Sequence, residues 1–507
     1  ALPISTLGNT LVFALASTAL AFALGAYVAW IVERTNAPWR RFIGMMLIAR
    51  IVIPGVLITI SWILLASPRI GILNFVMRDL FGVVNFFNIY SFAGMIWVHA
   101  LEMTPLAYLL MSAAFQSMDP RLEEAAIMSG AGTAGVLRRV ALPLATPAVG
   151  AALLLLFITT IETFEVPLLM GGRAGVRVLA SEIFLNTSRT PVDWGLSAAY
   201  SMSMVVVTLA LLAWYLGLLR HGERYQTVTG KDFRPRRVDL RRWRWPAAAL
   251  ACLIVFLITG VPLLVMIYAS FLPTWQPPSA AYFSSVTVAN YVALWRSSNT
   301  IAPLVNSTIL GIGSATVIVL LAALVAWFTQ RSRLRGAKLL DGLAFASIAL
   351  PSVVLGATFV WLYLIVPLPV IGTLVIIGLA YVTRYLPYAL RFVTTSMAQL
   401  HAELEEAAHM AGAPWWRTFV RVTLPLLKPG LLAAWFWVMV HAYRELTIAL
   451  MLARSQNRTA AVLILDLWEQ GSFLRLSAFG VIIFAVLMAL VAVSHLIGSR
   501  IGVREQA

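Results

Sequence analysis

Charged side chains interrupt several long apolar segments of this chain. On insertion scales a charge at the centre of a bilayer costs about 2.5–3.5 kcal/mol, so each such residue needs a partner or water. Carboxylates and guanidinium groups in such places either hold helices together or line a polar path for a solute. The candidates for these two roles are Glu102, Arg384, Glu162, Arg444, Glu165 and Glu445.

The sequence contains no recognisable catalytic or metal-binding pattern. Gly230-Lys231 is the nearest approach to a phosphate-binding loop, but Tyr225 stands where the first glycine of such a loop would be. The single cysteine, Cys252, excludes an intrachain disulfide and a cysteine metal site. We therefore expect no catalytic residues, no metal and no cofactor in this chain, and no ATP binding by the chain alone.

Two polar stretches share one pattern, in which Glu-Ala-Ala is followed by a glycine and then by a Leu-Pro pair. Every position of the second copy lies 282 residues after its counterpart in the first copy. A match of this length without a gap does not arise readily by chance. The pattern comprises Glu124, Ala125, Ala126, Gly130, Leu142 and Pro143 in the first copy, and Glu406, Ala407, Ala408, Gly412, Leu424 and Pro425 in the second.

Each copy predicts a helix, a turn and a second short helix lying outside the bilayer, within residues 119–145 and 401–427. Alanines lack bulk, so a helix that carries them can approach another protein surface closely. Glycine readily takes the left-handed conformation that ends a helix. One copy alone could be an ordinary amphipathic connector, but two copies favour a docking surface.

These elements belong to a chain with the composition of a membrane protein, since 61% of its 507 residues are hydrophobic and 11% are charged. Eleven apolar segments are long enough to cross a bilayer, which predicts an all-α polytopic membrane protein. The segments are 7–31, 42–66, 89–115, 146–170, 195–219, 247–272, 303–329, 341–366, 370–396, 429–452 and 481–496 with its flanks.

The net charge of +16 is distributed as a membrane protein requires. If both Glu-Ala-Ala stretches are cytoplasmic, the connections on that side carry 24 Lys and Arg residues and those on the other side carry 9. This bias fits the positive-inside rule. It places the C-terminus in the cytoplasm and makes a nucleic-acid partner unnecessary.

The chain is a tandem duplication with both halves in the same orientation. Asn9, Trp30 and Pro54 have counterparts 297 residues later, whereas the Glu-Ala-Ala stretches are 282 residues apart. The first half therefore carries 15 more residues than the second (297 − 282), and we place them within 67–88. We divide the chain into a first half (1–219), a basic linker (220–246) and a second half (247–507). The counterpart of segment 247–272 would precede residue 1, so we expect one more N-terminal span and about twelve in all.

The duplication suggests partners for the intramembrane charges. Glu102 and Arg384 are equivalent positions, and so are Glu162 and Arg444. Equivalent positions near a pseudo-two-fold axis face each other, so the fused chain can place a carboxylate against a guanidinium. Whether these pairs only lock the halves together or also line the path is left open by the sequence.

The Glu-Ala-Ala stretches resemble the coupling loops of ABC-importer permeases, the binding-protein-dependent inner-membrane components. The resemblance implies a tandem type I (MetI-like) transmembrane domain in the bacterial inner membrane, and it makes each loop a coupling helix that docks on a cytoplasmic ATPase. The implied partners are two ATP-binding subunits, which bind ATP and Mg²⁺, an external substrate-binding protein and membrane lipid.

Residues 161–169, 224–231 and 444–447 narrow the resemblance to the fused permeases of the ferric-iron type. Ferric iron is therefore the implied substrate, and thiamine, phosphonate, sugar phosphate and polyamine are alternatives for the same machinery. A secondary transporter is the competing class, because such proteins also commonly have two six-span halves. It would give no reason for two matching docking loops.

Overall fold

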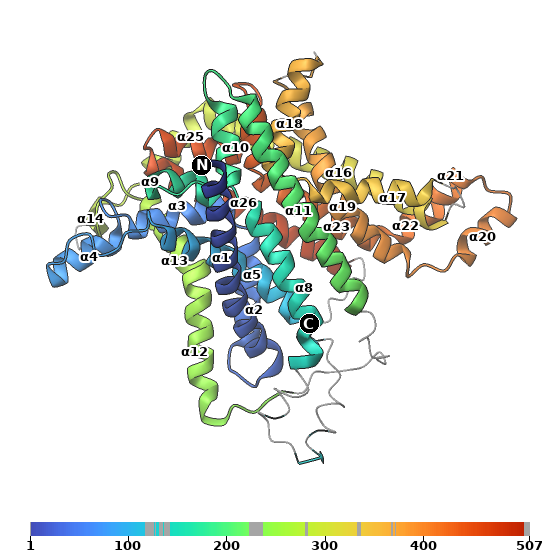
Figure 1. The fold of residues 1–507 in the computed structure, drawn as a ribbon, viewed down its shortest axis with the longest axis horizontal. Coiled ribbons are helices and arrows are strands. Elements are labelled where there is room, and N and C mark those ends of the chain that lie inside the picture. Colours follow the sequence, from blue (N-terminus) through green and yellow to red (C-terminus); the bar gives the residue numbers. More distant parts are fainter. Residues whose placement is uncertain are drawn as a thin grey trace. The chain divides into compact units, whose positions relative to one another are not determined.

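A computed structural model of the chain describes residues 2–116, 126, 128–130, 135, 142–222, 237–278, 282–331, 336–366, 369–370 and 372–500. The described part is helical and contains no strand beyond one isolated bridge between Thr35 and Val238. The chain forms two compact units, residues 1–287 and 288–507 (Figure 1). Each unit is described by itself below.

Unit 1 contains the helices of the first half and one long apolar helical segment that follows the linker. Its elements are α1 (Leu2–Arg34), α2 (Arg40–Ile51), α3 (Gly55–Ala66), α4 (Ile72–Phe81), α5 (Phe92–Gln116), α8 (Leu142–Ile161), η2 (Pro167–Gly171), α9 (Gly172–Ala174), α10 (Leu179–Ser188), α11 (Trp194–Gly222), η4 (Arg241–Trp243), α12 (Arg244–Val255), η5 (Phe256–Gly260), α13 (Val261–Ser270) and α14 (Tyr282–Ser285).

Unit 2 repeats most of this order. Its elements are α15 (Ala289–Arg296), α16 (Ser298–Arg331), α17 (Ala337–Ala346), η6 (Ser347–Ala349), α18 (Ser352–Ile365), α19 (Leu374–Met397), α20 (Glu403–Met410), α21 (Trp415–Thr418), η7 (Phe419–Thr423), α22 (Leu424–Leu426), α23 (Lys428–Arg444), α24 (Thr447–Leu452), α25 (Ala460–Glu469) and α26 (Phe473–Arg500).

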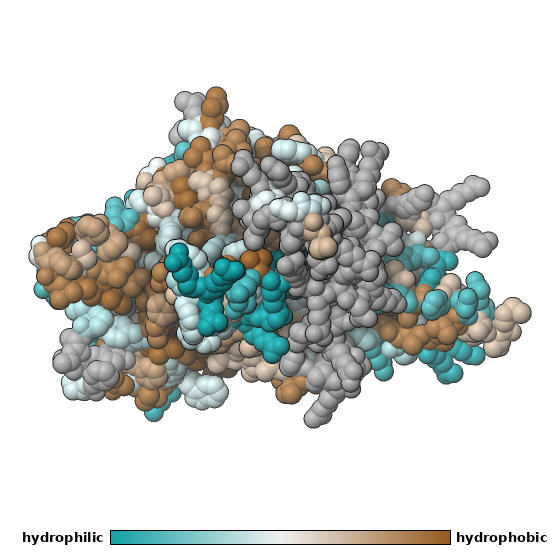
Figure 2. Space-filling view, turned by 90° about the horizontal axis from the view of Figure 1, so that it is seen from below, coloured by the Kyte–Doolittle hydropathy of each residue, from teal (hydrophilic) through white to brown (hydrophobic). Residues whose placement is uncertain are grey.

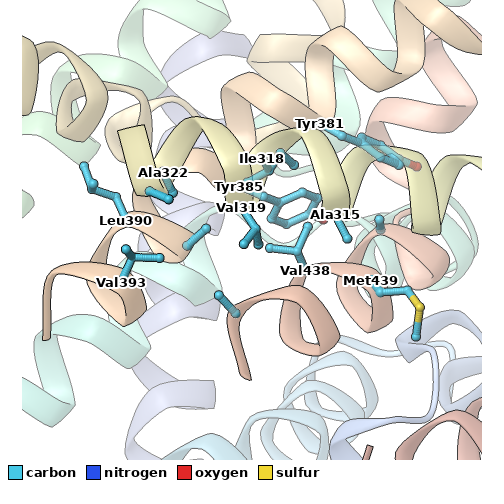
Figure 3. Packing of buried hydrophobic residues seen from close by; sticks show 14 of the residues in the cluster. Ala315, Ile318, Val319, Ala322, Tyr381, Tyr385, Leu390, Val393, Val438 and Met439 are labelled. Atoms are coloured by element: carbon cyan, nitrogen blue, oxygen red, sulfur yellow. The ribbon is translucent and has the colours of Figure 1, made fainter. Parts of the chain in front are cut away.

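The same three-helix core recurs in both units. Helices α1, α5 and α8 pack on one another in unit 1, and their counterparts α16, α19 and α23 do so in unit 2. In unit 2 the small side chains of Ala315 and Ala322 lie on α16 among Tyr385 and Val438 of the neighbouring helices (Figure 3). Small residues let membrane helices approach closely. Because equivalent helices pack on one another in both units, the packing confirms the internal duplication.

Each unit also contains one sharply broken span at an equivalent proline. The axis turns by 105° between α2 and α3 and by 104° between the 339–349 segment and α18. Pro54 and Pro351 stand at the N-terminal ends of α3 and α18. Proline lacks the N–H that would continue the preceding helix and fits the first turn of the next one.

The equivalent residues Thr10 and Ser307 make the same hydrogen bond in the two units. The Thr10 hydroxyl accepts a 2.9 Å hydrogen bond from the N–H of Leu179 at the start of α10. Its counterpart, Ser307, accepts one of 2.8 Å from Ala460 at the start of α25. First-turn N–H groups have no partner inside their own helix, so in both units the first core helix supplies a partner for the N-terminus of a distant helix.

The eleven predicted segments all coincide with helices or helix pairs of the described chain. By length and apolar composition alone, six helices could each cross a membrane, or up to nine spans if each bent pair counts as one. Helix α8 contains a shorter apolar stretch, Thr146–Ile161, and α19 carries Arg384 and Arg391. The all-α polytopic architecture predicted from the sequence is thus the observed one.

The described end of the linker and the segment after it pack with the first half of the chain. Helix α12 contacts α1 and α2, and α13 contacts α3. Before α12, Val238 donates its N–H to Arg34 O (2.7 Å), and the Asn36 amide donates to Asp239 (2.6 Å). The end of the linker is therefore bound to the connection between α1 and α2.

Candidate functional site

The second Glu-Ala-Ala stretch forms a short helix, α20, that ends at Gly412. Gly412 has φ of 78°. The N–H of Ala413 bonds to Ala408 O (3.0 Å) and the N–H of Gly412 to His409 O (2.9 Å), which is the hydrogen-bond pattern of a Schellman cap. After the turn, α21, η7 and α22 form one helical run that includes Leu424 and Pro425.

A buried carboxylate fixes α20 to the rest of this motif. Glu405 accepts a 2.8 Å hydrogen bond from the Thr423 hydroxyl of η7, and its Oε1 lies 3.7 Å from Arg331 Nε at the end of α16. Arg331 also donates from Nη2 to Leu400 O (2.7 Å). The helix is thus tied both to the helical run after the turn and to the core of unit 2.

The motif residues that the sequence pattern identified are not part of this anchor. Glu406, Ala407 and Gly412 are exposed, and Ala408 is half-buried. After the turn, Trp415 stacks on Trp327 of the core with ring centroids 5.4 Å apart, although about half of its surface is exposed. The motif therefore presents a carboxylate and small residues on a rigidly held helix.

The first motif is described only in part. Glu124 and Ala125 lie outside the described residues. Ala126 is helical, Gly130 has φ of 85° as its counterpart does, and Leu142 and Pro143 begin α8. Both glycines thus adopt the left-handed conformation, in which a residue with a side chain is strained.

Sequence reasoning missed Glu405, the residue that anchors the helix. A signal was present, because both copies read Leu-Glu-Glu-Ala-Ala and the first glutamate of each, Glu123 and Glu405, is repeated too. Arg331 likewise has a counterpart in Arg34, which is buried and donates to Phe115 O (3.5 Å). The repetition alone could not tell which glutamate faces inward, because that depends on the path of the chain after the turn.

Two of the predicted intramembrane carboxylates meet in unit 1. Glu102 lies on α5, and Glu165 follows the break at the end of α8. A Cβ atom added at Gly55 would overlap Glu102 Oε1 and Glu165 Oε2, so both carboxylates reach the same point beside the broken span. His99 is fully buried nearby, with Nδ1 3.5 Å from Glu102 Oε2 and 3.4 Å from the Thr163 hydroxyl.

Glu445 of unit 2 is held by its own unit. Its carboxylate accepts hydrogen bonds from the Tyr385 hydroxyl (2.7 Å) and from the N–H of Ile448 in α24 (3.1 Å). The second bond caps the first turn of α24, where N–H groups lack partners. Glu445 therefore has a structural role within unit 2 that the sequence pattern did not show.

An arginine reaches the broken span in both units, but from different helices. Arg50 of α2 donates from Nη1 to Ile53 O (3.1 Å), and Arg384 of α19 donates from Nη1 to the equivalent Leu350 O (2.9 Å). Both carbonyls immediately precede the proline of the break. At the position equivalent to Arg384, unit 1 has Glu102, so the two arginines that bond to these carbonyls stand at positions that are not equivalent.

The remaining predictions for intramembrane charges concern relations between the units. The pairs Glu102 with Arg384 and Glu162 with Arg444 would each join unit 1 to unit 2, and they stay predictions. Across the part of the chain that the structure describes, no three His, Cys, Asp or Glu side chains are arranged so that they could hold a metal ion.

Comparison with protein families gives one match that covers more than half of the chain. The model of the binding-protein-dependent transport system inner membrane component matches residues 21–221 and 318–500. The two matched regions contain both Glu-Ala-Ala stretches, the whole of the core helices α5, α8, α19 and α23, and the C-terminal parts of α1 and α16.

Two permease relatives agree with this match. The ferric transport system permease protein FbpB of Actinobacillus pleuropneumoniae is 26% identical over 480 residues, which are 94% of this chain and 68% of the relative. The trehalose transport system permease protein SugB of Mycobacterium tuberculosis is 29% identical over 202 residues, 38% of this chain and 69% of the relative. A solved bacterial ABC transporter involved in alginate import is 17% identical with a TM-score of 0.43, covering 52% of this chain and 97% of that chain.

Proposed function

The chain belongs to the family of binding-protein-dependent transport system inner membrane components, and from this premise we propose that its two halves form the solute path of an importer driven by two separate ATP-binding subunits. The chain is an ABC importer permease of the multi-pass inner-membrane class. Permease components of this kind are not enzymes themselves, so we assign ATP hydrolysis to the partner subunits.

The observation that carries the proposal is the construction of the second motif. Glu405 is buried and bonded to Thr423, whereas Glu406 and Ala407 next to it are exposed. A helix that must transmit movement needs a firm attachment to its own core and a free face for its partner. Helix α20 has both, since Glu405 ties it to α16 and η7 while its small-residue face is open.

The proposed mechanism is alternating access. ATP binding closes the two ATP-binding subunits on each other, and they displace α20 and the stretch around Glu124. The displacement of α20 passes through the Glu405 anchor into the three-helix core of unit 2, and we propose that the first motif acts on unit 1 in the same way. The two halves then separate on the opposite side, where a substrate-binding protein releases its solute into the cavity.

We propose ferric iron as the solute. The support is the ferric transport permease FbpB, whose similarity extends over 94% of this chain. The neighbouring carboxylates of Glu102 and Glu165 agree with this choice, because carboxylate oxygens suit hard cations. Thiamine, phosphonate, sugar phosphate and polyamine are the alternatives that a substrate test must include.

The test is reconstitution of the full chain with candidate ATP-binding subunits and the genetically linked substrate-binding protein. We expect the subunits to co-purify with the chain and their ATPase activity to rise several-fold when the binding protein is loaded with Fe³⁺. Stimulation by another of the named solutes alone would refute iron but retain the importer. Solute uptake driven by an ion gradient without any ATP-binding subunit would instead establish a secondary transporter.

A further inference from the structure

Helix α4 carries an apolar face that no described residue of unit 1 covers. At the spacing of one helical face, Val76 and Leu80 are 40% and 71% exposed, and Phe81 beside them is 68% exposed. Val83, Val84 and Phe86 extend this surface beyond the helix. Hydrophobic residues dominate the left end of Figure 2, the region that holds α4 in Figure 1.

The opposite face of α4 is polar and attached to the protein. Arg78 and Asp79 form a 3.0 Å ion pair. Asn74 is buried and donates to Ser67 O (2.9 Å) and Phe87 O (2.8 Å), while its Oδ1 accepts the N–H of Phe87 (2.9 Å). These bonds tie the residues before α4 to those after it, so its apolar face has a fixed direction.

The surroundings of α4 have the character of a membrane interface. Just before the helix, Ile70 O accepts a 3.0 Å hydrogen bond from Trp275 Nε1, and the Trp275 ring contacts Tyr268. At the start of α5, the Tyr90 hydroxyl accepts a 2.6 Å hydrogen bond from Arg173. Tryptophan, tyrosine and arginine concentrate where a membrane protein passes through the headgroup layer.

A candidate membrane span whose end leads to α4 also has an exposed apolar surface. The candidate span 241–270 carries exposed apolar side chains along its length, which include Leu250, Leu253, Phe256, Leu264 and Ile267. Its C-terminal end leads to Trp275 and so to the start of α4. In Figure 1, α4 runs across the direction of α1 and α12, as a helix in the plane of a bilayer would.

We propose that α4 is an interfacial helix that lies in the headgroup layer of the bilayer, with Val76, Leu80 and Phe81 toward the acyl chains. An amphipathic helix gains free energy there because its apolar face leaves water while its charges stay hydrated. The helix lies within residues 67–88, where the first half has its additional residues, so the anchor is specific to unit 1. Residues 67–88 and the Glu-Ala-Ala stretch at 119–145 stand at opposite ends of the predicted span 89–115, so we place α4 in the outer leaflet, an assignment that rests on the proposed function.

Site-specific fluorescence quenching tests this proposal. The sole cysteine is removed by Cys252→Ala, and Leu80→Cys or Arg78→Cys is labelled with an environment-sensitive dye. These positions lie on opposite faces of α4. The full chain is reconstituted into vesicles of phosphatidylethanolamine and phosphatidylglycerol that contain phosphatidylcholine with a nitroxide near the headgroup. Leu253→Cys, on the exposed stripe of α12, is the lipid-facing control, and Val84→Cys replaces Leu80→Cys if the latter does not fold.

We expect the lipid nitroxide to quench the dye at Leu80→Cys, and iodide to quench it several-fold less than at Arg78→Cys. Equal access of iodide to both positions would overturn the proposal, as would protection of Leu80→Cys without quenching by lipid, since protein would then cover the face. The assay needs no ATP-binding subunit. A chain that fails to bind such subunits but keeps this quenching pattern would refute the proposed function and not the anchor.

Discussion

The hydroxyl of Thr423 donates a 2.8 Å hydrogen bond to the carboxylate of Glu405, although eighteen residues separate them in the chain. This bond joins the helix before the Gly412 turn to the helical run after it. It closes the motif on itself, and the next residue, Glu406, is left exposed. Two adjacent glutamates of one repeated motif thus have different surroundings.

The first prediction separates these two glutamates. Glu405→Gln weakens a hydrogen bond to a charged group, a class of interaction worth about 1.5–3 kcal/mol, so we expect a lower thermal unfolding temperature and weaker coupling of ATP hydrolysis to substrate. Thr423→Val should have a similar effect, and the double variant should cost less than the sum. Glu406→Gln is the matched control, with an unchanged unfolding temperature. If Glu405→Gln, Thr423→Val and the double variant all unfold at the same temperature as Glu406→Gln, Glu405 does not anchor the helix.

The second prediction concerns the turn. No atom of the described residues lies within 4 Å of a Cβ added at Gly412, so we expect a substitution there to act through the backbone conformation. Gly412→Val should lower substrate-stimulated ATPase activity severely, because a β-branched residue does not tolerate this positive φ. Gly412→Asn should retain most of the activity, since asparagine visits the left-handed region. The same comparison applies to Gly130→Val and Gly130→Asn, and normal coupling in both valine variants would contradict the docking role.

The third prediction concerns the carboxylates beside the broken span. Gly55→Ala places a methyl group where Glu102 and Glu165 meet, so both side chains must move while the fold persists. We expect solute transport to fall strongly with little change in unfolding temperature. Gly313→Ala, at an open position inside α16, is the matched control and should stabilise the helix by about 0.5–1 kcal/mol. Undiminished transport by Gly55→Ala would show that these carboxylates do not line the solute path.

The fourth prediction is the charge-exchanged pair. If Glu102 and Arg384 meet in the assembled chain, Glu102→Gln or Arg384→Gln leaves an uncompensated charge, which typically costs about 3–5 kcal/mol. The exchange Glu102→Arg with Arg384→Glu should recover part of the lost stability and transport. Because Arg384 also bonds to Leu350 O, complete recovery is not expected. If the exchanged variant is no better than the worse single variant, the two charges act separately.

The fifth prediction is a pH dependence at the linker. The N–H of Arg241, followed by the Asn36 amide, lowers the pKa of Asp239 by hydrogen-bonding to its carboxylate. A lowered pKa means that this contact is complete above the unfolded pKa of about 3.9 and is lost as the pH falls through the lower folded value. Hydrogen exchange of residues 238–241, corrected for the intrinsic rate, should therefore accelerate only in acid. Asn36→Ala should accelerate it several-fold at neutral pH while α12 stays protected, and an unchanged rate would exclude the contact.

Several features of this protein follow from the sequence because they depend on composition or on short-range geometry. Apolar length predicts helices that cross a bilayer, and all eleven predicted segments are helical in the structure. The two constant offsets reveal the duplication without any knowledge of packing. The motif glycines could be assigned as turns because only a local conformation was at stake, and Gly130 and Gly412 both have positive φ.

Only the tertiary structure decided which of these residues are anchored. Glu405 and Glu406 are adjacent glutamates on one helix, and the buried one is chosen by where η7 returns after the turn. Arg50 and Arg384 bond to equivalent carbonyls from different helices, which no alignment of the two halves would show. Glu102 and Glu165 converge because the chain is broken at Pro54 and again after α8. Such contacts join residues far apart in the sequence, so they depend on how helices pack, and residue types and spacing alone do not specify that packing.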